Sequence, residues 1–394
     1  MSEGATEQTD DDTTGTADQP DDADPDTDTG DEATTDDTDT AASEGAGTDA
    51  DTDTDPAAVG VKLGSTRTVV AMPGTDGVET VQTLTCLTTY EDVLTGEEQV
   101  LYGQEAATEY PDSVRFMLRS GLPEDDESAG LAETFFSTFV ESNAVPEESV
   151  VVYAVPTLDE AQGRENLTAV VEGAPIGEAG LRSYPESLCA SIPALGDGLD
   201  AVEKTFLGVN LGSTNLEASA YRRGSQLQRY ATGSVTGNEV DRTIANYVEE
   251  ETQGRVNIDR TTAREYKEAH ADFVDYDPFS DIVQQPGGGT HEFTIETSVM
   301  DAVDEYVDDA VDELANAFLP ELANNNLKVY RRALESPIVL TGGMTAIPGL
   351  VDEIEQRLSD ELNQDVTCIA ADDPATAAAR GAQRIATRLA ADGA

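Results

Sequence analysis

The pattern of apolar and polar positions changes abruptly near residue 58. Residues 1–57 contain almost no apolar side chains, whereas short β-branched runs begin at residue 59. Runs at residues 59–63, 68–72 and 78–84 predict three strands, and a continuous apolar run at residues 150–155, ending at Pro156, predicts a buried one. A second group of strands is predicted at residues 206–211, 216–221 and 226–231.

Helical segments alternate with these strands. Helices are predicted at residues 131–140, where apolar side chains recur four apart, and at residues 239–251 and 261–273. The clearest one covers residues 298–319, where apolar side chains form one stripe and acids fill the opposite face. A final strand–helix–strand–helix unit is predicted at residues 338–341, 347–362, 366–369 and 375–390. This alternation indicates an α/β architecture with mixed sheets.

The length of the patterned region predicts two domains, because about 336 residues are more than a single hydrophobic core usually contains. We expect an acidic tail over residues 1–57, a first domain over 58–200 and a second over 201–394, with the helix at 375–390 packing back on the first. The tail cannot bury enough apolar surface to offset the entropy of ordering, so it is predicted to be disordered. A solubilising role for it is favoured over a docking role.

The net charge of −58 is extreme for a folded protein. Residues 1–57 hold 21 of the 80 acids and none of the 22 bases, which leaves −37 on the remainder. Only 4 of the bases are lysine. In a cytoplasm at molar salt, a Debye length of ~3 Å screens the resulting repulsion. The composition therefore indicates an extremely halophilic, archaeal source; the alternative is an ordinary acidic protein.

The same composition argues against several partners. Nucleic acids and anionic membrane surfaces both require clustered Lys and Arg. No apolar run approaches the ~20 residues of a membrane span, and no signal peptide is visible. Three scattered cysteines and two histidines fit no metal-ligand spacing. We therefore expect a cytoplasmic protein without nucleic-acid or direct membrane binding and without a His or Cys metal site.

A duplicated motif carries the strongest chemical signal. Gly-Val-Lys-Leu-Gly-Ser-Thr at residues 60–66 recurs as Gly-Val-Asn-Leu-Gly-Ser-Thr at residues 208–214, with six of seven positions identical. Each copy joins two predicted strands, so each forms a hairpin turn. Glycine lets a ligand approach the backbone, and turn N–H groups with Ser and Thr hydroxyls can bind an anion. One copy alone would be an ordinary turn; two facing copies could hold a polyphosphate from both sides.

A third glycine segment follows the strand predicted at residues 338–341. It reads Thr-Gly-Gly-Met-Thr-Ala-Ile-Pro-Gly over residues 341–349 and precedes a helix. The bare backbone at Gly342 and Gly343 would let a flat base or a phosphate pack close to the chain.

The order hairpin, hairpin and strand–Thr-Gly-Gly–helix resembles the superfamily of actin, seventy-kilodalton heat-shock chaperones and sugar kinases, and in particular the bacterial rod-shape actin MreB. The resemblance covers residues 59–389. Further segments are similar to family motifs at residues 101–107, 151–156, 186–191, 236–241, 263–267 and 372–381.

The resemblance implies a duplicated, ribonuclease H-like actin fold with ATP or another nucleotide in a central cleft between two domains. The residues that it implies for nucleotide binding lie in the two turns, the third glycine segment and two neighbouring positions: Gly64, Ser65, Thr66, Gly212, Ser213, Thr214, Gly237, Lys267, Gly342, Gly343 and Met344.

Glu186 stands where the family polarises the attacking water, so it is the candidate catalytic residue. A carboxylate that merely suits the positive end of a helix dipole is the alternative. For Lys267, a surface salt bridge is the alternative to a role beside the nucleotide.

The motif departs from the family at two positions. The family has an acid two residues before each turn glycine, and this sequence has Lys62 and Asn210. Those acids surround Mg²⁺, which prefers oxygen ligands, so the use of Mg²⁺ is in doubt. Lys62 could replace the metal's charge, the phosphates and waters alone could hold the metal, or the cleft could be empty and purely structural. We favour the first.

The resemblance implies a cytoskeletal protein whose subunits bind nucleotide and polymerise with one another in a high-salt cytoplasm, with weakened hydrolysis. A non-polymerising, catalytically degenerate nucleotide-binding regulator or scaffold is the alternative that Lys62 and Asn210 favour. A chaperone-type ATPase is disfavoured, because it would need a substrate-binding domain after the nucleotide domain.

Overall fold

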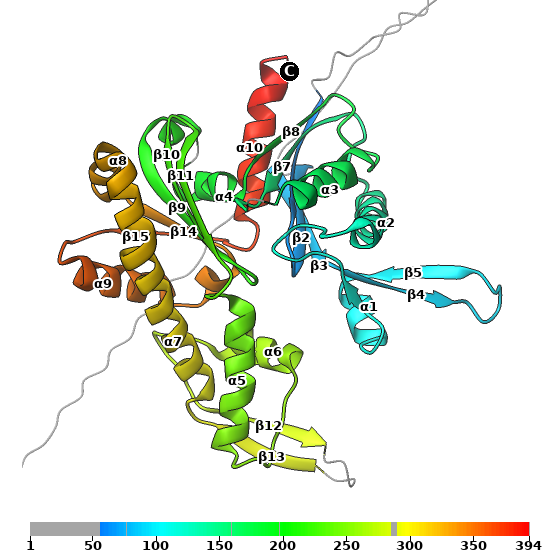
Figure 1. Cartoon of the computed structure of the whole chain (residues 1–394). Helices are drawn as coiled ribbons and strands as arrows, with labels where there is room; N and C mark the ends of the chain where they lie inside the picture. The colour runs from blue at the N-terminus through cyan, green and yellow to red at the C-terminus, as the bar shows by residue number, and fades with distance from the viewer. Residues whose placement is uncertain (1–55, 76, 159, 197, 285–289, 394) are drawn as a thin grey trace, which may run out of the picture. The chain divides into compact units, whose positions relative to one another are not determined.

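The computed structural model describes residues 56–75, 77–158, 160–196, 198–284 and 290–393. The predicted disordered tail lies outside the described residues, apart from Pro56 and Ala57. The described residues belong to one compact unit. Helices in this unit cover two separate sheets (Figure 1).

The two main sheets have the same topology, and they confirm the predicted α/β architecture. Each is an antiparallel three-stranded meander extended by two parallel strands, in the orders β3-β2-β1-β7-β8 and β11-β10-β9-β14-β15. The first sheet consists of β1 (Ala57–Leu63), β2 (Arg67–Gly74), β3 (Gly77–Leu84), β7 (Ser149–Val155) and β8 (Gly180–Pro185). The second consists of β9 (Thr205–Leu211), β10 (Leu216–Arg222), β11 (Ser225–Thr232), β14 (Ile338–Thr341) and β15 (Cys368–Ile369).

Helices connect and cover these strands. Those of the first half are α1 (Gly103–Glu109), α2 (Asp126–Ser142), α3 (Ala161–Glu172), α4 (Glu186–Ala194) and the short η1 (Asp200–Glu203). Those that follow are α5 (Gly237–Glu251), α6 (Arg260–His270), α7 (Ser298–Asp312), η2 (Glu313–Phe318), α8 (Leu319–Leu334), η3 (Gly343–Ala346), α9 (Leu350–Leu362) and α10 (Ala377–Ala391).

Small sheets complete the described part of the chain. β4 (Cys86–Glu91) pairs with β5 (Glu98–Tyr102) and β6 (Arg115–Phe116), and β12 (Phe279–Gln284) pairs with β13 (Thr290–Ile295). The sequence pattern did not predict these strands or β8. The side chains of β5, β6 and β8 are exposed or half-buried, so these strands lack the apolar runs that marked the buried ones.

Both faces of the first sheet are buried at its central strands, β1 and β7. In β7, Val151, Tyr153 and Val155 pack with α2 and α3, whereas the alternate residues Val150 and Val152 pack with α4 and α10. Because side chains alternate across a strand, a strand covered on both faces reads as a continuous apolar run. This explains the uninterrupted apolar sequence at residues 150–155.

Small residues let α10 and α4 approach each other and the sheets very closely. A Cβ added at Gly60 of β1 would lie 2.0 Å from the Ala379 carbonyl oxygen of α10. A Cβ at Gly381 of α10 would lie 1.7 Å from the Cys189 carbonyl oxygen of α4. In the second sheet, a Cβ at Gly208 would lie 2.8 Å from the Ser191 hydroxyl of α4. The two helices therefore pack together and against equivalent central strands.

The prediction that the acidic helix ends near Leu319 was wrong. α7 continues through the widened π turn η2 into α8, which reaches Leu334. Pro320, near the start of α8, lacks the N–H that an α-helix uses. A π segment relaxes that bonding pattern just before the proline. A later kink, at Asn326 (φ −152°), divides α8.

We expect Gly381→Ala to lower the free energy of unfolding by at least ~1–3 kcal/mol, because the new methyl group collides with backbone. Gly130→Ala is the matched control: this exposed glycine of α2 has nothing within 4 Å of an added Cβ, and alanine there should stabilise the helix by ~0.5–1 kcal/mol. Urea unfolding at molar KCl measures both. Equal stabilities for the two variants would contradict this account of α10 packing.

Candidate functional site

The two duplicated turns face each other at hydrogen-bond distance. The Ser65 hydroxyl lies 3.2 Å from that of Thr214, and the Thr66 hydroxyl donates to that of Ser213 at 3.0 Å. Each turn is closed in the same way, by a bond from its glycine N–H to the carbonyl three residues later. The structure thus brings together two segments 148 residues apart in the sequence.

A cavity of about 300 Å³ lies at these turns. Both turns, α5, α6, η3 and the segment before α10 line it. Ten of the residues implied by the sequence resemblance or its departures are on the lining: Lys62, Gly64, Ser65, Thr66, Gly212, Ser213, Gly237, Lys267, Gly343 and Met344. Further lining residues are Arg67, Asn238, Asp241, Arg264, Glu268, Ala271, Ala346, Ile347, Pro348, Pro374 and Ala375.

The N-terminus of α5 is tied to the second turn. The N–H of Gly237 donates to the Gly212 carbonyl at 3.0 Å, and that of Asn238 donates to the Ser213 carbonyl at 2.8 Å. A Cβ at Gly237 would lie 3.2 Å from the Met344 sulfur, which leaves little room for a side chain. The turn, α5 and η3 therefore meet at one wall of the cavity.

Gly342 is not on the cavity wall. It adopts φ 93°, and a Cβ there would lie 2.5 Å from both the Asn210 side-chain oxygen and the Leu211 carbonyl oxygen. Its role in the structure is to let β14 leave the sheet close against β9. Gly343, by contrast, has nothing within 4 Å of an added Cβ, so its bare backbone faces open space.

The two departures from the family pattern converge on the candidate catalytic residue. The Lys62 ammonium lies 2.7 Å from Oε1 of Glu186, and the Asn210 amide donates to the same oxygen at 3.1 Å. Glu186 is the first residue of α4 and is only 5% exposed, whereas Lys62 also lines the cavity. Lys62 therefore lines the cavity and pairs with Glu186, which is not on the lining. Glu186 is a buried, paired carboxylate rather than a solvated helix-end acid.

A second buried carboxylate, Glu217, lies beside this cluster and was missed by the sequence analysis. Glu217 is directly opposite Asn210 in the β9–β10 register and is 0% exposed. Its oxygens accept from the Thr157 N–H at 3.0 Å and from the Asn215 amide at 2.5 Å. Burial, reinforced by the nearby Glu186 charge, raises the pKa of Glu217 to about 7. The signal that could have revealed it was a lone acid within the predicted strand at residues 216–221.

Lys267 forms a buried ion pair rather than a surface one. Its ammonium donates to Asp241 at 2.5 Å and to the Gly237 carbonyl at 3.0 Å, and it is 7% exposed. Burial raises the pKa of Asp241, and Lys267 partly offsets that shift. The alternative of a surface salt bridge is therefore wrong, and this pair fixes α6 to α5 at the cavity wall.

A bidentate ion pair crosses from β2 to α6 at the cavity. The Arg67 guanidinium donates to the two Glu268 oxygens at 3.1 and 2.8 Å. Burial acts to raise the pKa of Glu268, but Arg67, Arg264 and Lys267 outweigh it and hold the pKa below its usual range. The two halves are thus joined at the cavity by this pair and by the turn hydroxyls.

The chemistry of the donor set does not fit a metal ion beside Glu186. The Lys62 ammonium already lies 2.7 Å from the Glu186 carboxylate, and two cations at one place repel each other. Among the described residues, no group of three or more His, Cys, Asp or Glu side chains could hold a metal ion. In the same part of the chain, no helix is long and apolar enough to cross a membrane.

Solved structures with the same architecture identify the fold of this chain. MreB5 of Spiroplasma citri bound to ADP matches with a TM-score of 0.65 and 18% identity, over 85% of this chain and 97% of that one. The MamK double helical filament matches with a TM-score of 0.66 and 20% identity, over 84% and 98%. At such identities the likeness shows the fold alone, which is the actin-like fold.

Comparison of the amino-acid sequence shows the family to which this chain belongs. The salactin family model matches residues 56–390. Salactin of Halobacterium salinarum is 63% identical over 334 residues, which are 85% of this chain and 92% of that protein. The chain therefore belongs to the salactin family, and its relative comes from a haloarchaeon.

The pH dependence of stability tests the environment of Glu217. Because the pKa of Glu217 is raised in the folded state, its contribution is full below the unfolded value of ~4.3 and is lost as pH rises through about 7. Over that window the free energy of unfolding should fall by up to ~1.4 kcal/mol per pH unit. Glu217→Gln should remove this loss.

Thermal unfolding at molar KCl between pH 5 and pH 8 measures the effect. The stability of Glu217→Gln relative to the natural protein should rise with pH, whereas that of the exposed control Glu172→Gln should not. A pH-independent difference for Glu217→Gln would show that Glu217 is ionised throughout.

Proposed function

We propose that this protein binds a nucleoside di- or triphosphate between the two duplicated turns and assembles with copies of itself into filaments in a high-salt cytoplasm. The observation that carries the binding proposal is the pair of matching Gly-Ser-Thr turns whose hydroxyls meet at one 300 Å³ cavity. Pockets of this size and larger hold small-molecule ligands. MreB5 of Spiroplasma citri, which shares the fold, has been solved with ADP and with AMPPNP.

Each wall of the cavity supplies a different kind of contact. The N–H groups and hydroxyls of Ser65 and Thr66 on one side, and of Ser213 on the other, would bind phosphate oxygens. Gly343 and Met344 would lie against the nucleoside, since the open backbone at Gly343 admits a flat ring. Lys267 is held by Asp241 at the same wall, so its charge is largely compensated within the protein. We assign it to positioning α6 rather than to neutralising phosphate.

We propose that Lys62 takes over the charge that a metal ion supplies in related proteins. The ammonium faces the cavity and is 2.7 Å from Glu186, so it can contact a phosphate chain and the carboxylate together. In this arrangement Mg²⁺ is dispensable for binding. Glu186 is held by two donors, which leaves its carboxylate poorly available to polarise a water and so weakens hydrolysis.

Self-assembly is supported by the fold that this chain shares with MamK, of which a double helical filament has been solved. The Lys62–Glu186–Asn210 cluster favours a second candidate, a nucleotide-binding regulator that does not polymerise, because it points to impaired turnover. The two functions differ in whether the purified protein sediments.

Nucleotide binding should not require Mg²⁺. ATP titrations at molar KCl should give similar affinities with Mg²⁺ and with a chelator. Lys62→Asp puts an acid at this position. Without Mg²⁺, in chelator, the affinity of this variant for ATP should fall by at least about tenfold, ~1.4 kcal/mol. Adding Mg²⁺ should restore the affinity. Lys328→Asp, at an exposed lysine of α8, should behave as the natural protein does. A strict Mg²⁺ requirement in the natural protein would refute the proposed role of Lys62.

Assembly should depend on the cavity. We expect the protein to sediment at molar KCl with ATP and to stay in the supernatant without it. Gly343→Val places a branched side chain in the cavity and should abolish both ATP binding and sedimentation, whereas Gly233→Val, at an exposed glycine with equally open surroundings, should change neither. A protein that remains monomeric under all nucleotide and salt conditions would favour the non-polymerising regulator.

A further inference from the structure

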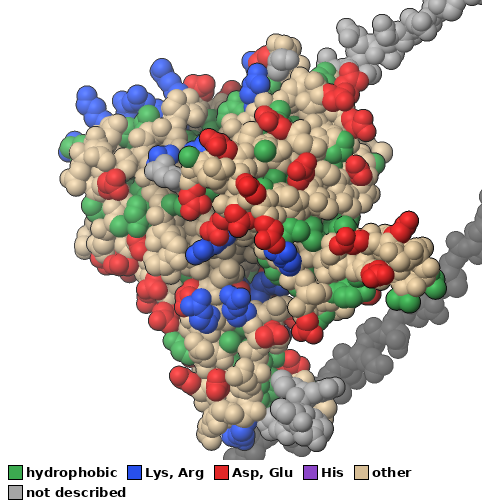
Figure 2. Space-filling model, turned by 45° about the vertical axis from the view of Figure 1, so that its right-hand side comes forward, with side chains coloured by type: hydrophobic (Ala, Val, Ile, Leu, Met, Phe, Trp, Pro, Cys, Tyr) green, Lys and Arg blue, Asp and Glu red, His purple; other side chains and the backbone are tan. Residues whose placement is uncertain are grey.

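The cavity is lined by basic side chains in a chain that is otherwise acidic. Among the described residues, the charged side chains of the lining are four cations and two acids: Lys62, Arg67, Arg264, Lys267, Asp241 and Glu268. The whole chain has 80 acids and 22 bases, so the lining reverses the overall composition. Figure 2 shows Lys and Arg side chains around the hollow in the middle of the visible face. The lining therefore suits an anionic ligand.

Arg264 differs from the other three cations of the lining in having no partner. The other three are paired with acids of the protein at N–O distances of 2.7, 2.8 and 2.5 Å: Lys62 with Glu186, Arg67 with Glu268, and Lys267 with Asp241. Arg264 forms neither an ion pair nor a hydrogen bond within the part of the chain that the structure describes. Both acids of the lining are already bound by other cations. The guanidinium of Arg264 therefore has its donors unused.

Helix α6 directs Arg264 toward the cavity. Arg264, Lys267, Glu268 and Ala271 all line it, and their spacing of three, four and seven residues is that of one helix face. Arg264 is half-buried. Burial raises the pKa of the Cys86 thiol on β4 to about 11, and the charge of Arg264 acts against this shift. Because β4 belongs to the first half, the guanidinium extends from α6 toward the opposite wall of the cavity.

A half-buried guanidinium without a partner favours a phosphate ligand on physical grounds. Partial removal of a cation from water costs free energy unless an acceptor or an anion compensates. At molar salt the Debye length of ~3 Å screens distant charges, so only direct contacts compensate. Arginine binds phosphate through two parallel N–H groups and stays charged at every pH of interest. A phosphate in the cavity would therefore supply what the protein itself does not.

We infer that Arg264 contacts the ligand and donates to its phosphate oxygens, an inference that rests on the nucleotide binding proposed above. Lys62 and Arg264 then contact the phosphate chain from the β1 and α6 walls. Lys62 shares its charge with Glu186, whereas the charge of Arg264 is uncompensated until the ligand arrives. The ligand class is therefore a nucleotide with at least two phosphates, rather than a nucleoside or a monophosphate.

The base of the nucleotide fits a different part of the lining. Its apolar residues include Ala271, just after α6, with Ile347 and Pro348, just after η3. The Phe273 N–H donates to the Pro348 carbonyl at 2.9 Å, so these two segments lie side by side. Arg264 precedes Ala271 by seven residues, which is about 10 Å along a helix. A base at Ala271 therefore leaves Arg264 to the phosphates.

Arg264→Gln tests this contact, because glutamine removes the charge and is a good helix former. In titrations at molar KCl with chelator, the affinity of this variant for ATP and for ADP should fall at least about tenfold, ~1.4 kcal/mol. Its affinity for adenosine should equal that of the natural protein. Without ligand, the variant should unfold at the temperature of the natural protein, because no internal bond is lost, and ATP should raise that temperature less.

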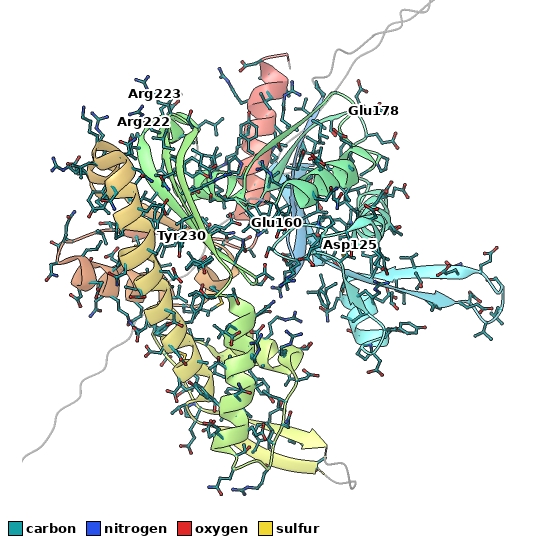
Figure 3. The ribbon with its side chains drawn as sticks, in the orientation of Figure 1. Asp125, Glu160, Glu178, Arg222, Arg223 and Tyr230 are labelled. Carbon is teal, nitrogen blue, oxygen red and sulfur yellow. The ribbon has the colours of Figure 1, made fainter. Side chains whose placement is uncertain are left out.

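Arg222→Gln is the matched control and should bind ATP as the natural protein does. Arg222 is an exposed arginine at the end of β10 that lies away from the second turn, and Figure 3 shows it at the outer end of the β10–β11 hairpin. Unchanged ATP affinity of Arg264→Gln would show a merely solvated cation and overturn the inference. An equal loss of affinity for ATP and adenosine would also overturn it, because Arg264 would then contact the nucleoside. If the natural protein binds neither ATP nor ADP, the proposed function fails first, and this inference fails with it.

Discussion

The close packing of α4 and α10 between the two sheets is the constraint on which the site depends. Gly60, Gly208 and Gly381 remove side chains where backbone meets backbone or a hydroxyl, so α10 lies on β1 and α4 lies on β9 at the same depth. This equivalence sets the two central strands, and hence the turns that follow them, across one cavity. A helix that packed at an ordinary distance would separate the turns beyond the reach of their hydroxyls.

The charged groups beside the turns differ from those that the sequence resemblance implies. The turns have glycines and hydroxyls, while Lys62 and Asn210 stand where the resemblance implies acids and bind Glu186. Glu217, next to Asn210, compensates for its burial by two hydrogen bonds and a raised pKa. The cavity therefore has an internal cation, Lys62, paired with a buried carboxylate, Glu186.

The sequence alone predicted the features that repeat and the buried strands whose apolar runs are continuous. The hairpins, the Thr-Gly-Gly segment and the buried strands were all recovered, because each has a local signature. The continuation of the acidic helix past Leu319, through the π turn η2 into α8, was not predicted. Glu217 was missed because a single acid in a strand gives no hint of which buried groups surround it.

The sequence by itself determined the α/β alternation, the duplicated turns, the extreme acidity and the replacement of the two acids, because each is written in local composition or repetition. Only the tertiary structure decided that Lys62 and Asn210 share one oxygen of Glu186 and that Lys267 is buried against Asp241. These are pairings between residues far apart in the chain, and the distances that create them exist only after the sheets and helices have packed.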